Sequence, residues 1–227
     1  MKLENLNITI EKTSRKKTVS IFIERDGSVR VLAPDTASDD LVEAAVKAKE
    51  YQIFTKIAKW KELNHGKVNR EYVNGQSFLY LGRNYRLKLT ESQDVPLKIS
   101  GGYFHLDKLY LPQADKVFKA FYRDKAIEKI KERLTLIEEK FTQKPTSIKV
   151  LDLQNRWASW TPSNGLNFHW KCILAPIKVL DYIITHEMVH LKYPNHSTKF
   201  WNELDKKMPD YAASEAWLKK NGIKLDL

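Results

Sequence analysis

The chain has 227 residues, of which 42% are hydrophobic and 30% are charged, with few glycines and prolines. This balance is typical of a globular protein and excludes a fibrous or disordered chain. The formal net charge of +11 favours an acidic partner such as a nucleotide or nucleic acid, although a lysine-rich solvated surface explains it equally well. No run of 18 apolar residues is present, so we expect no membrane-spanning segment.

The first third of the chain is predicted to contain strands followed by a helix. Residues 8–12 and 18–34 alternate apolar and polar side chains, and Asp26 with Gly27 is typical of a hairpin turn. Residues 38–60 change to helical spacing, with Ser38 suited to cap the first turn.

The middle of the chain is predicted to form more strands and one long helix. Residues 77–92 and 96–112 read as pairs of short strands, with tight turns at Gly82–Arg83 and Gly101–Gly102. From Asp115 to about Thr142, apolar residues recur with the helical period and charged residues occupy the opposite face.

The last third is predicted to begin with two or three strands and to end with helices. The strands lie within residues 147–175, with a hairpin turn at 163–165, and a helix follows from Pro176 to Pro194. Two short helices are expected around 197–207 and 210–220. Strands and helices are partly segregated along the chain, which indicates the α+β class.

A histidine-rich stretch, THEMVHLKYPNH at 185–196, holds three of the six histidines of the chain. His186 and His190 are four residues apart on the predicted helix, so their side chains share one face and can bind one metal ion. Glu187 is rotated by about 100° from His186. It is therefore suited to act as a general base on a water molecule rather than as a ligand.

A catalytic zinc ion needs a third protein ligand and one open position. His196 is the predicted third ligand, because the helix ends at Pro194 and the chain can turn back. The spacing of the three histidines matches the metzincin pattern, but Tyr193 replaces the glycine of that pattern. Glu203 and Glu215 on the downstream helices are the alternatives. Zn²⁺ is the expected ion, and another divalent ion such as Mn²⁺ or Ni²⁺ can occupy the same ligands.

The two histidines can also be ordinary surface residues of an amphipathic helix. Most of that helix is apolar, however, so the histidines should line a cleft or a buried face, where unpartnered polar groups are costly. The apolar residues are Ile177, Leu180, Ile183, Ile184 and Leu191.

Three segments, at 15–34, 78–89 and 155–201, resemble the YgjP-like family of metal-dependent hydrolases, which carry a minimal gluzincin-type metallopeptidase domain. The resemblance covers nearly the whole chain. Its signature is an R-W-G-S-C segment before H-E-x-x-H and a downstream H-x-x-x-F-W. In this sequence the first segment reads R-W-A-S-W, so that Trp160 stands where the family has a cysteine. Cys172, the one cysteine of the chain, is expected to be a buried small side chain rather than a replacement.

The resemblance implies roles for the residues of the signature. His186, His190 and His196 are the implied metal ligands and Glu187 the implied base. Phe200 and Trp201 are implied to pack the helix that follows the third histidine. The implied fold has antiparallel N-terminal strands and a helix, followed by a zincin-like region whose H-E-x-x-H helix packs on a small sheet. We expect one domain over 1–227, with a further division into a β-rich part, 1–112, and a zincin-like part, 113–227.

The substrate class remains open at this point. The first prediction is a zinc-dependent hydrolase of the metallopeptidase type, which activates water with a glutamate base. Because members of the family are also linked to nucleotides, the alternative is a nucleoside triphosphate pyrophosphatase that converts UTP to UMP and pyrophosphate at the same site. A weaker alternative is a DNA-associated protease like the distantly related SprT group, or a nucleic-acid-binding protein with structural zinc.

The two main substrates make different demands on the same strand. A peptide would lie extended along residues 155–160, beside the H-E-x-x-H helix. A nucleotide would use Arg156, with Arg83 and Arg86 as further candidates, because a guanidinium group binds two phosphate oxygens. Each arginine can instead be a solvated or ion-paired surface residue. Trp157, which follows Arg156 in the signature, is a further candidate for substrate binding.

The single cysteine and the N-terminus bear on the compartment. One cysteine allows no disulfide within the chain. The first twelve residues lack the apolar core of a signal peptide. We therefore expect a cytoplasmic protein without a membrane partner, and the sequence leaves the oligomeric state open.

Overall fold

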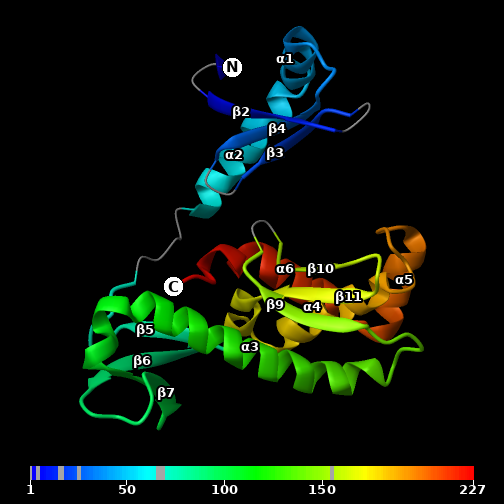
Figure 1. The fold of residues 1–227 in the computed structure, drawn as a ribbon. Helices are drawn as coiled ribbons and strands as arrows, with labels where there is room; N and C mark the ends of the chain where they lie inside the picture. Colours follow the sequence, from blue (N-terminus) through cyan, green and yellow to red (C-terminus); the bar gives the residue numbers. More distant parts are fainter. Residues whose placement is uncertain (1, 4–5, 15–17, 25–26, 65–69, 154–155) are drawn as a thin grey trace. The chain divides into compact units, whose positions relative to one another are not determined.

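The computed structural model describes residues 2–3, 6–14, 18–24, 27–64, 70–153 and 156–227 (Figure 1). The chain divides into two compact units, Met1–Lys67 and Val68–Leu227. Among the described residues, no helix combines the length and the apolar character needed to cross a lipid bilayer. The α+β class is confirmed.

The first unit contains one four-stranded sheet and two helices: β1 (Lys2–Leu3), β2 (Leu6–Thr13), β3 (Ser20–Ile23), β4 (Val29–Pro34), α1 (Asp39–Lys47) and α2 (Glu50–Asn64). The strand order is β1-β2-β4-β3. Antiparallel pairing joins β3 to β4, as predicted, and also β1 to β2. The pairing of β2 with β4 is parallel. After β2 the chain forms β3 at the far edge of the sheet, and β4 then lies between them, antiparallel to β3 and parallel to β2.

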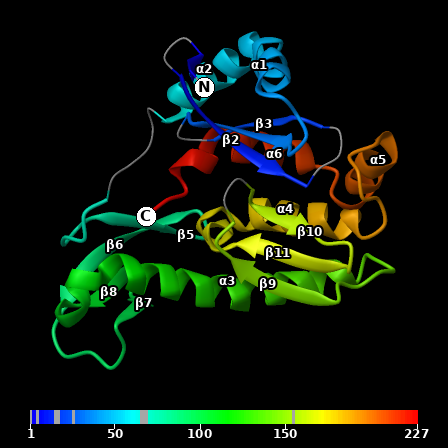
Figure 2. The same ribbon diagram turned by 45° about the horizontal axis from the view of Figure 1, so that its top comes forward.

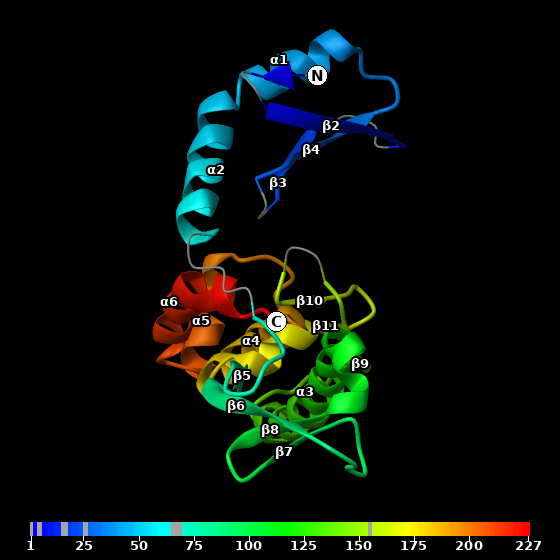
Figure 3. The same cartoon turned by 90° about the vertical axis from the view of Figure 1, so that its left-hand side faces the viewer.

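The helical segment predicted at 38–60 is divided into α1 and α2 near Ala48 and Lys49. The Ser38 side chain caps α1 by accepting a hydrogen bond from the Leu41 N–H at 3.4 Å, as expected. Both helices bury their apolar residues against the sheet, and Figure 3 shows them on one side of it. The shared core consists of Ile8, Val29, Val31, Ala33, Val42, Val46, Ile53 and Ile57. Asp26, the first residue of the predicted hairpin turn, lies outside the described residues.

The second unit contains two sheets, with strand orders β5-β6-β8-β7 and β10-β11-β9. Its strands are β5 (Ser77–Tyr80), β6 (Arg83–Thr90), β7 (Leu97–Ser100), β8 (Tyr103–Asp107), β9 (Ser147–Leu151), β10 (Ala158–Trp160) and β11 (Gly165–His169). Its α-helices are α3 (Ala114–Glu138), α4 (Ile177–His190), α5 (Thr198–Lys207) and α6 (Tyr211–Asn221). The 3₁₀ helices are η1 (Lys108–Gln113), η2 (Trp170–Leu174) and η3 (Gly222–Lys224).

The strands at 77–107 share a core with α3 and α4. The boundary between the two compact units falls at 67/68, and the further division into 1–112 and 113–227 stays a prediction. That the whole chain behaves as one domain stays a prediction.

The long helix α3 contributes many of the residues of this core and packs against α4 (Figure 2). Its predicted apolar stripe is buried at Phe118, Ile130 and Leu134, among others. On the surface between the two helices, the Arg133 guanidinium donates two hydrogen bonds, at 2.7 and 2.8 Å, to the Asp181 carboxylate. Such a bidentate pair fixes relative position as well as adding energy.

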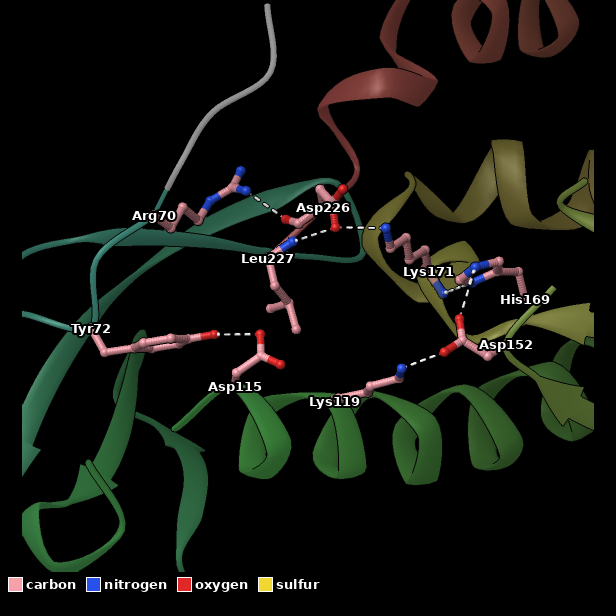
Figure 4. A network of polar contacts seen from close by, with 9 residues as sticks. All are labelled: Arg70, Tyr72, Asp115, Lys119, Asp152, His169, Lys171, Asp226 and Leu227. Atoms are coloured by element: carbon pink, nitrogen blue, oxygen red, sulfur yellow. Dashed lines mark hydrogen bonds and ion pairs between the residues drawn. The ribbon is translucent and has the colours of Figure 1, made fainter. Parts of the chain in front are cut away.

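Polar contacts attach the C-terminal residues to the segment that leads into α4 (Figure 4). The Asp226 carboxylate pairs with the Lys171 ammonium at 2.6 Å, and the Asp226 carbonyl accepts a hydrogen bond from Arg70 at 2.5 Å. Asp152, just after β9, pairs with Lys119 of α3. These contacts hold η2, and with it the start of α4, against the rest of the unit.

The turn between β5 and β6 also contacts the start of α4. Its central residues are Leu81 (φ 49°) and Gly82 (φ 75°), one residue earlier than predicted. Their N–H groups donate to the carbonyls of Ile173 and Leu174 at 2.8 and 3.0 Å. A Cβ atom on Gly82 would lie 2.7 Å from Pro176 Cγ and 2.8 Å from Pro176 Cα. Only glycine therefore allows the turn to approach the helix this closely.

We predict that Gly82→Ala lowers the free energy of unfolding by about 2–4 kcal/mol, because positive φ and steric overlap both oppose it. Gly102→Ala is the matched control: its φ is 80°, and nothing lies within 4 Å of the added Cβ. That control should cost about 1 kcal/mol, the conformational penalty alone. Urea unfolding followed by circular dichroism measures both, and equal losses would show that the contact with Pro176 is unimportant.

Candidate metal centre

The last turns of α4 carry the candidate metal ligands and the candidate general base on a largely buried helix. The helix is buried along most of its length because it packs on both α3 and the small sheet. His186, Glu187 and His190 lie in its last turns, and the chain then bends before α5 begins at Thr198. Local sequence thus sets these side chains at one end of a rigid, buried element.

The bend brings His196 back to the two histidines of the helix. One ligand atom from each of His186, His190 and His196 lies within 4.8 Å of the other two. The three imidazole centroids are 4.7–5.0 Å apart. In the described part of the chain, this group includes neither Glu203 nor Glu215, the alternative third ligands.

A backbone carbonyl orients one of the rings. Nδ1 of His190 lies 3.0 Å from the Tyr193 carbonyl oxygen. Because a carbonyl only accepts, Nδ1 carries the proton, and the lone pair of Nε2 is left for a metal ion. Tyr193 occupies the glycine position of the metzincin pattern, yet its φ is not positive. The bend therefore needs no glycine here.

Burial keeps two of the imidazoles neutral. Burial, with the nearby His190 and His196, lowers the pKa of His186 to about 3. Burial also lowers the pKa of His190. Within the described residues, Nδ1 of His186 is buried without a hydrogen-bond partner, and Nε2 of His186 lies 2.9 Å from Nε2 of His196. Neutral imidazoles with converging nitrogen atoms are the donor set that Zn²⁺ prefers.

Two aromatic residues of α5 support the three rings. The centroid of the fully buried Phe200 ring lies 4.5–4.8 Å from each imidazole centroid. Trp201 stacks on His196 at 5.7 Å, with 27° between the planes. The family resemblance implied that these residues pack the helix. The sequence did not predict that these two side chains contact the imidazoles, because the spacing of residues along the chain does not determine which face of α5 packs against the histidines.

Glu187 lies between α4 and the small sheet and is only 7% exposed. Burial raises its pKa to about 7, against the opposing effects of a backbone hydrogen bond from Trp160 and of the Arg156 charge. The sequence did not reveal the Trp160 contact, because a backbone N–H belongs to every non-proline residue and leaves no mark in the residue pattern.

The contact with Trp160 places the carboxylate at the edge of the sheet, where β10 is the outermost strand. Backbone hydrogen bonds to β11 occur at Trp157 and Thr161. Since backbone groups alternate in direction along an antiparallel strand, those of Ala158 and Trp160 point to the outer edge. The Trp160 N–H faces the Glu187 carboxylate and lowers its pKa, and the remaining outward groups lie beside it.

The structure separates the predicted substrate-binding residues. Arg156 is exposed and its charge acts on Glu187. Trp157 is half-buried. Its indole packs against Gly222, so closely that a Cβ added to Gly222 would lie 2.9 Å from the indole Cζ2. The Trp157 carbonyl accepts a hydrogen bond from the Cys172 thiol at 3.2 Å. These contacts give Trp157 a packing role. Cys172 is fully buried, as expected, and burial raises its pKa, so it is no reactive thiol.

Arg83, the first residue of β6, lies near the other end of α4. Arg83 follows Gly82, which contacts Pro176, and His186 lies about 15 Å further along the helix axis. Arg83 and Arg86 are three residues apart in a strand, so their side chains leave opposite faces of the sheet. The described contacts bring only Arg156 to the site.

The model of the YgjP-like metallopeptidase domain matches residues 17–221. The chain belongs to the YgjP-like family. Comparisons with curated proteins and with solved structures gave no match. Family membership makes the chain a metal-dependent hydrolase and implies a divalent ion, typically Zn²⁺. Within this domain, His186, His190 and His196 form a group that fits such an ion.

We predict that His196→Ala lowers Zn²⁺ affinity by more than about 100-fold, since loss of an outer-shell partner of a ligand alone costs about 10–100-fold. Glu203→Ala and Glu215→Ala are the matched controls and should keep wild-type affinity, because neither carboxylate belongs to the histidine group. Competition with a chromogenic chelator measures all three. Loss of zinc in a glutamate variant, with retention in His196→Ala, would contradict the three-histidine assignment.

Proposed function

We propose that this YgjP-like chain is a zinc-dependent peptidase that hydrolyses a peptide bond in an extended segment paired with β10. Glu187 is the general base in this proposal, and His186, His190 and His196 are the metal ligands. The observation that carries it is the position of Glu187, whose carboxylate the Trp160 N–H faces at the outer edge of β10, beside the three histidines.

The histidine set supports a catalytic rather than a structural ion. In the described part of the chain the group has three ligands, whereas structural zinc sites use four. A bound zinc ion supplies Lewis acidity and lowers the pKa of a coordinated water to about 7. The same three-ligand count argues against a nucleic-acid-binding protein with structural zinc.

The protein side of the reaction follows from the burial of Glu187. A carboxyl group with a pKa of about 7 can both accept and release a proton near neutral pH, which is optimal for general acid–base catalysis. Glu187 takes one proton from the attacking water and then gives it to the leaving amine. The outward N–H and C=O groups of Ala158 and the C=O group of Trp160 hold the substrate backbone in the extended form by strand addition.

We predict that Glu187→Gln retains zinc but lowers kcat by about 10²–10⁴-fold, because the amide has the size of the carboxyl group and cannot accept the proton. Hydrolysis of an unstructured protein such as casein, with metal content measured on the same samples, checks this. Glu203→Gln is the control and should keep full activity. Peptidase activity undiminished in Glu187→Gln would remove the residue from the base role.

Arg156 supports a second candidate, a nucleoside triphosphate pyrophosphatase acting on UTP. Its guanidinium group is exposed, lies close enough to influence Glu187, and suits phosphate oxygens. The net charge of +11 also favours an anionic substrate. Pyrophosphate release from the four ribonucleoside triphosphates, with zinc or manganese, tests this candidate against Glu187→Gln. Release from UTP that disappears in the variant would favour the nucleotide over the peptide.

For a nucleotide substrate, we predict that Arg156→Gln raises KM by about 10–100-fold, the equivalent of one lost charge-assisted contact. The KM for a peptide should change far less. Arg83→Gln is the matched control, because Arg83 lies near the opposite end of α4 from the histidines. Initial rates over a range of substrate concentrations give both values. An equal rise in KM for both substrates would show that Arg156 does not select phosphate.

A further inference from the structure

A groove in the first unit lies between the edge strand β3 and the helices α1 and α2. Its volume is about 330 Å³. Apolar side chains form its floor and one wall: Val19, Ile21, Ile23, Ala45 and Ile53. All of its lining residues lie between Val19 and Lys56, so the groove belongs to the first unit alone and is separate from the metal centre.

The wall formed by β3 also offers free backbone positions. The Glu24 N–H donates to the Ser28 carbonyl at 2.8 Å, which extends the register of the β3–β4 pair by one residue. Because backbone groups alternate in direction, the N–H and C=O groups of Ile21 and Ile23 point away from β4. In the part of the chain that the structure describes, no strand pairs with that outer edge. Such an edge is a template for another strand.

The opposite wall carries positive charge. Lys49 and Lys56 line the groove on either side of Gln52 and Ile53, and no carboxylate is among the described lining residues. The Lys49 carbonyl accepts a hydrogen bond from the Ile53 N–H at 3.0 Å, so Lys49 immediately precedes the first turn of α2. Lys56 follows seven residues later, on the same face and about 10.5 Å further along the helix axis. In an extended peptide, residues four apart are separated by about 13 Å and share a face. Two acidic residues at that spacing would meet the two ammonium groups.

We propose that this groove binds an extended acidic–apolar segment of another protein by strand addition to β3. The segment has the pattern acidic-x-apolar-x-acidic. Its backbone pairs with Ile21 and Ile23, its apolar side chain enters the groove between β3 and Ile53, and its carboxylates pair with Lys49 and Lys56. The proposal does not depend on the hydrolase activity, because every group that it uses lies in the first unit.

The test uses the full chain and a fluorescein-labelled peptide, Gly-Ser-Glu-Thr-Val-Thr-Glu-Ser-Gly, with binding measured by fluorescence anisotropy. Lys49→Glu combined with Lys56→Glu should weaken binding at least 10-fold. It should also create binding of a second peptide in which lysine replaces both glutamates. Lys116→Glu with Lys220→Glu, two exposed lysines of the second unit, makes the same change in net charge and should alter the affinity less than 2-fold.

The backbone contribution has its own test. Ile21→Pro removes an N–H that points away from β4, so the β3–β4 hydrogen bonds remain while strand addition is blocked. It should weaken binding of the peptide at least 10-fold, whereas Ile21→Val should bind within 2-fold of wild type. Circular dichroism establishes that each variant is folded.

Three results would overturn the proposal. The first is no binding of the glutamate peptide to the wild-type chain, and the second is equal weakening by the two double lysine variants. The third is self-association of the wild-type chain that is lost in Lys49→Glu/Lys56→Glu, which would identify a second copy as the occupant.

Discussion

Burial of the last turns of α4 is the constraint on which the chemistry of the metal centre depends. Phe200 closes one side of the three imidazoles, and β10 covers the carboxylate of Glu187. Loss of water from these groups disfavours their charged forms. The histidines of α4 are therefore neutral, and the pKa of Glu187 rises to about 7. The same burial makes the site costly for folding unless the imidazole nitrogen atoms gain a partner, which a metal ion provides.

The rest of the second unit serves to hold α4 in place. The Arg133–Asp181 pair and the apolar side chains of α3 hold one side of α4. The turn at Gly82 contacts the start of α4, and Asp226 pairs with Lys171 of η2, the segment that precedes α4. These supports come from segments distant in the sequence. A site built on a rigid helix with several independent supports keeps its ligands within the narrow geometry that a metal ion and a general base require.

Open strand edges recur in both units, with different neighbours. The edge of β10 lies beside a buried carboxylate and three histidines, which is an environment for chemistry. The edge of β3 lies beside an apolar groove with two lysines, which is an environment for binding alone. Strand addition at both edges would give the protein one site that cleaves and one that only holds an extended chain.

Much of the local structure was predictable because it depends on residues close in the sequence. Hydrophobic periodicity located α3 and α4, and Ser38 marked the start of α1. The parallel pairing of β2 with β4 was not predictable, because it joins strands separated by another strand. The turn between β5 and β6 lies one residue earlier than predicted for a similar reason. Its conformation depends on hydrogen bonds from Leu81 and Gly82 to η2, more than ninety residues away in the sequence.

For the site itself, the sequence determined the donor atoms. It places His186 and His190 on one face of the helix and rotates Glu187 away from His186 around the helix axis. It also identifies the family to which the chain belongs. Only the tertiary structure decided that His196 joins the pair, that Arg83 and Arg86 lie elsewhere, and that Glu187 meets the backbone of an edge strand. The physical reason is that ligand identity and helical phase are local properties. Burial, pKa and the approach of distant segments arise only when the whole chain packs.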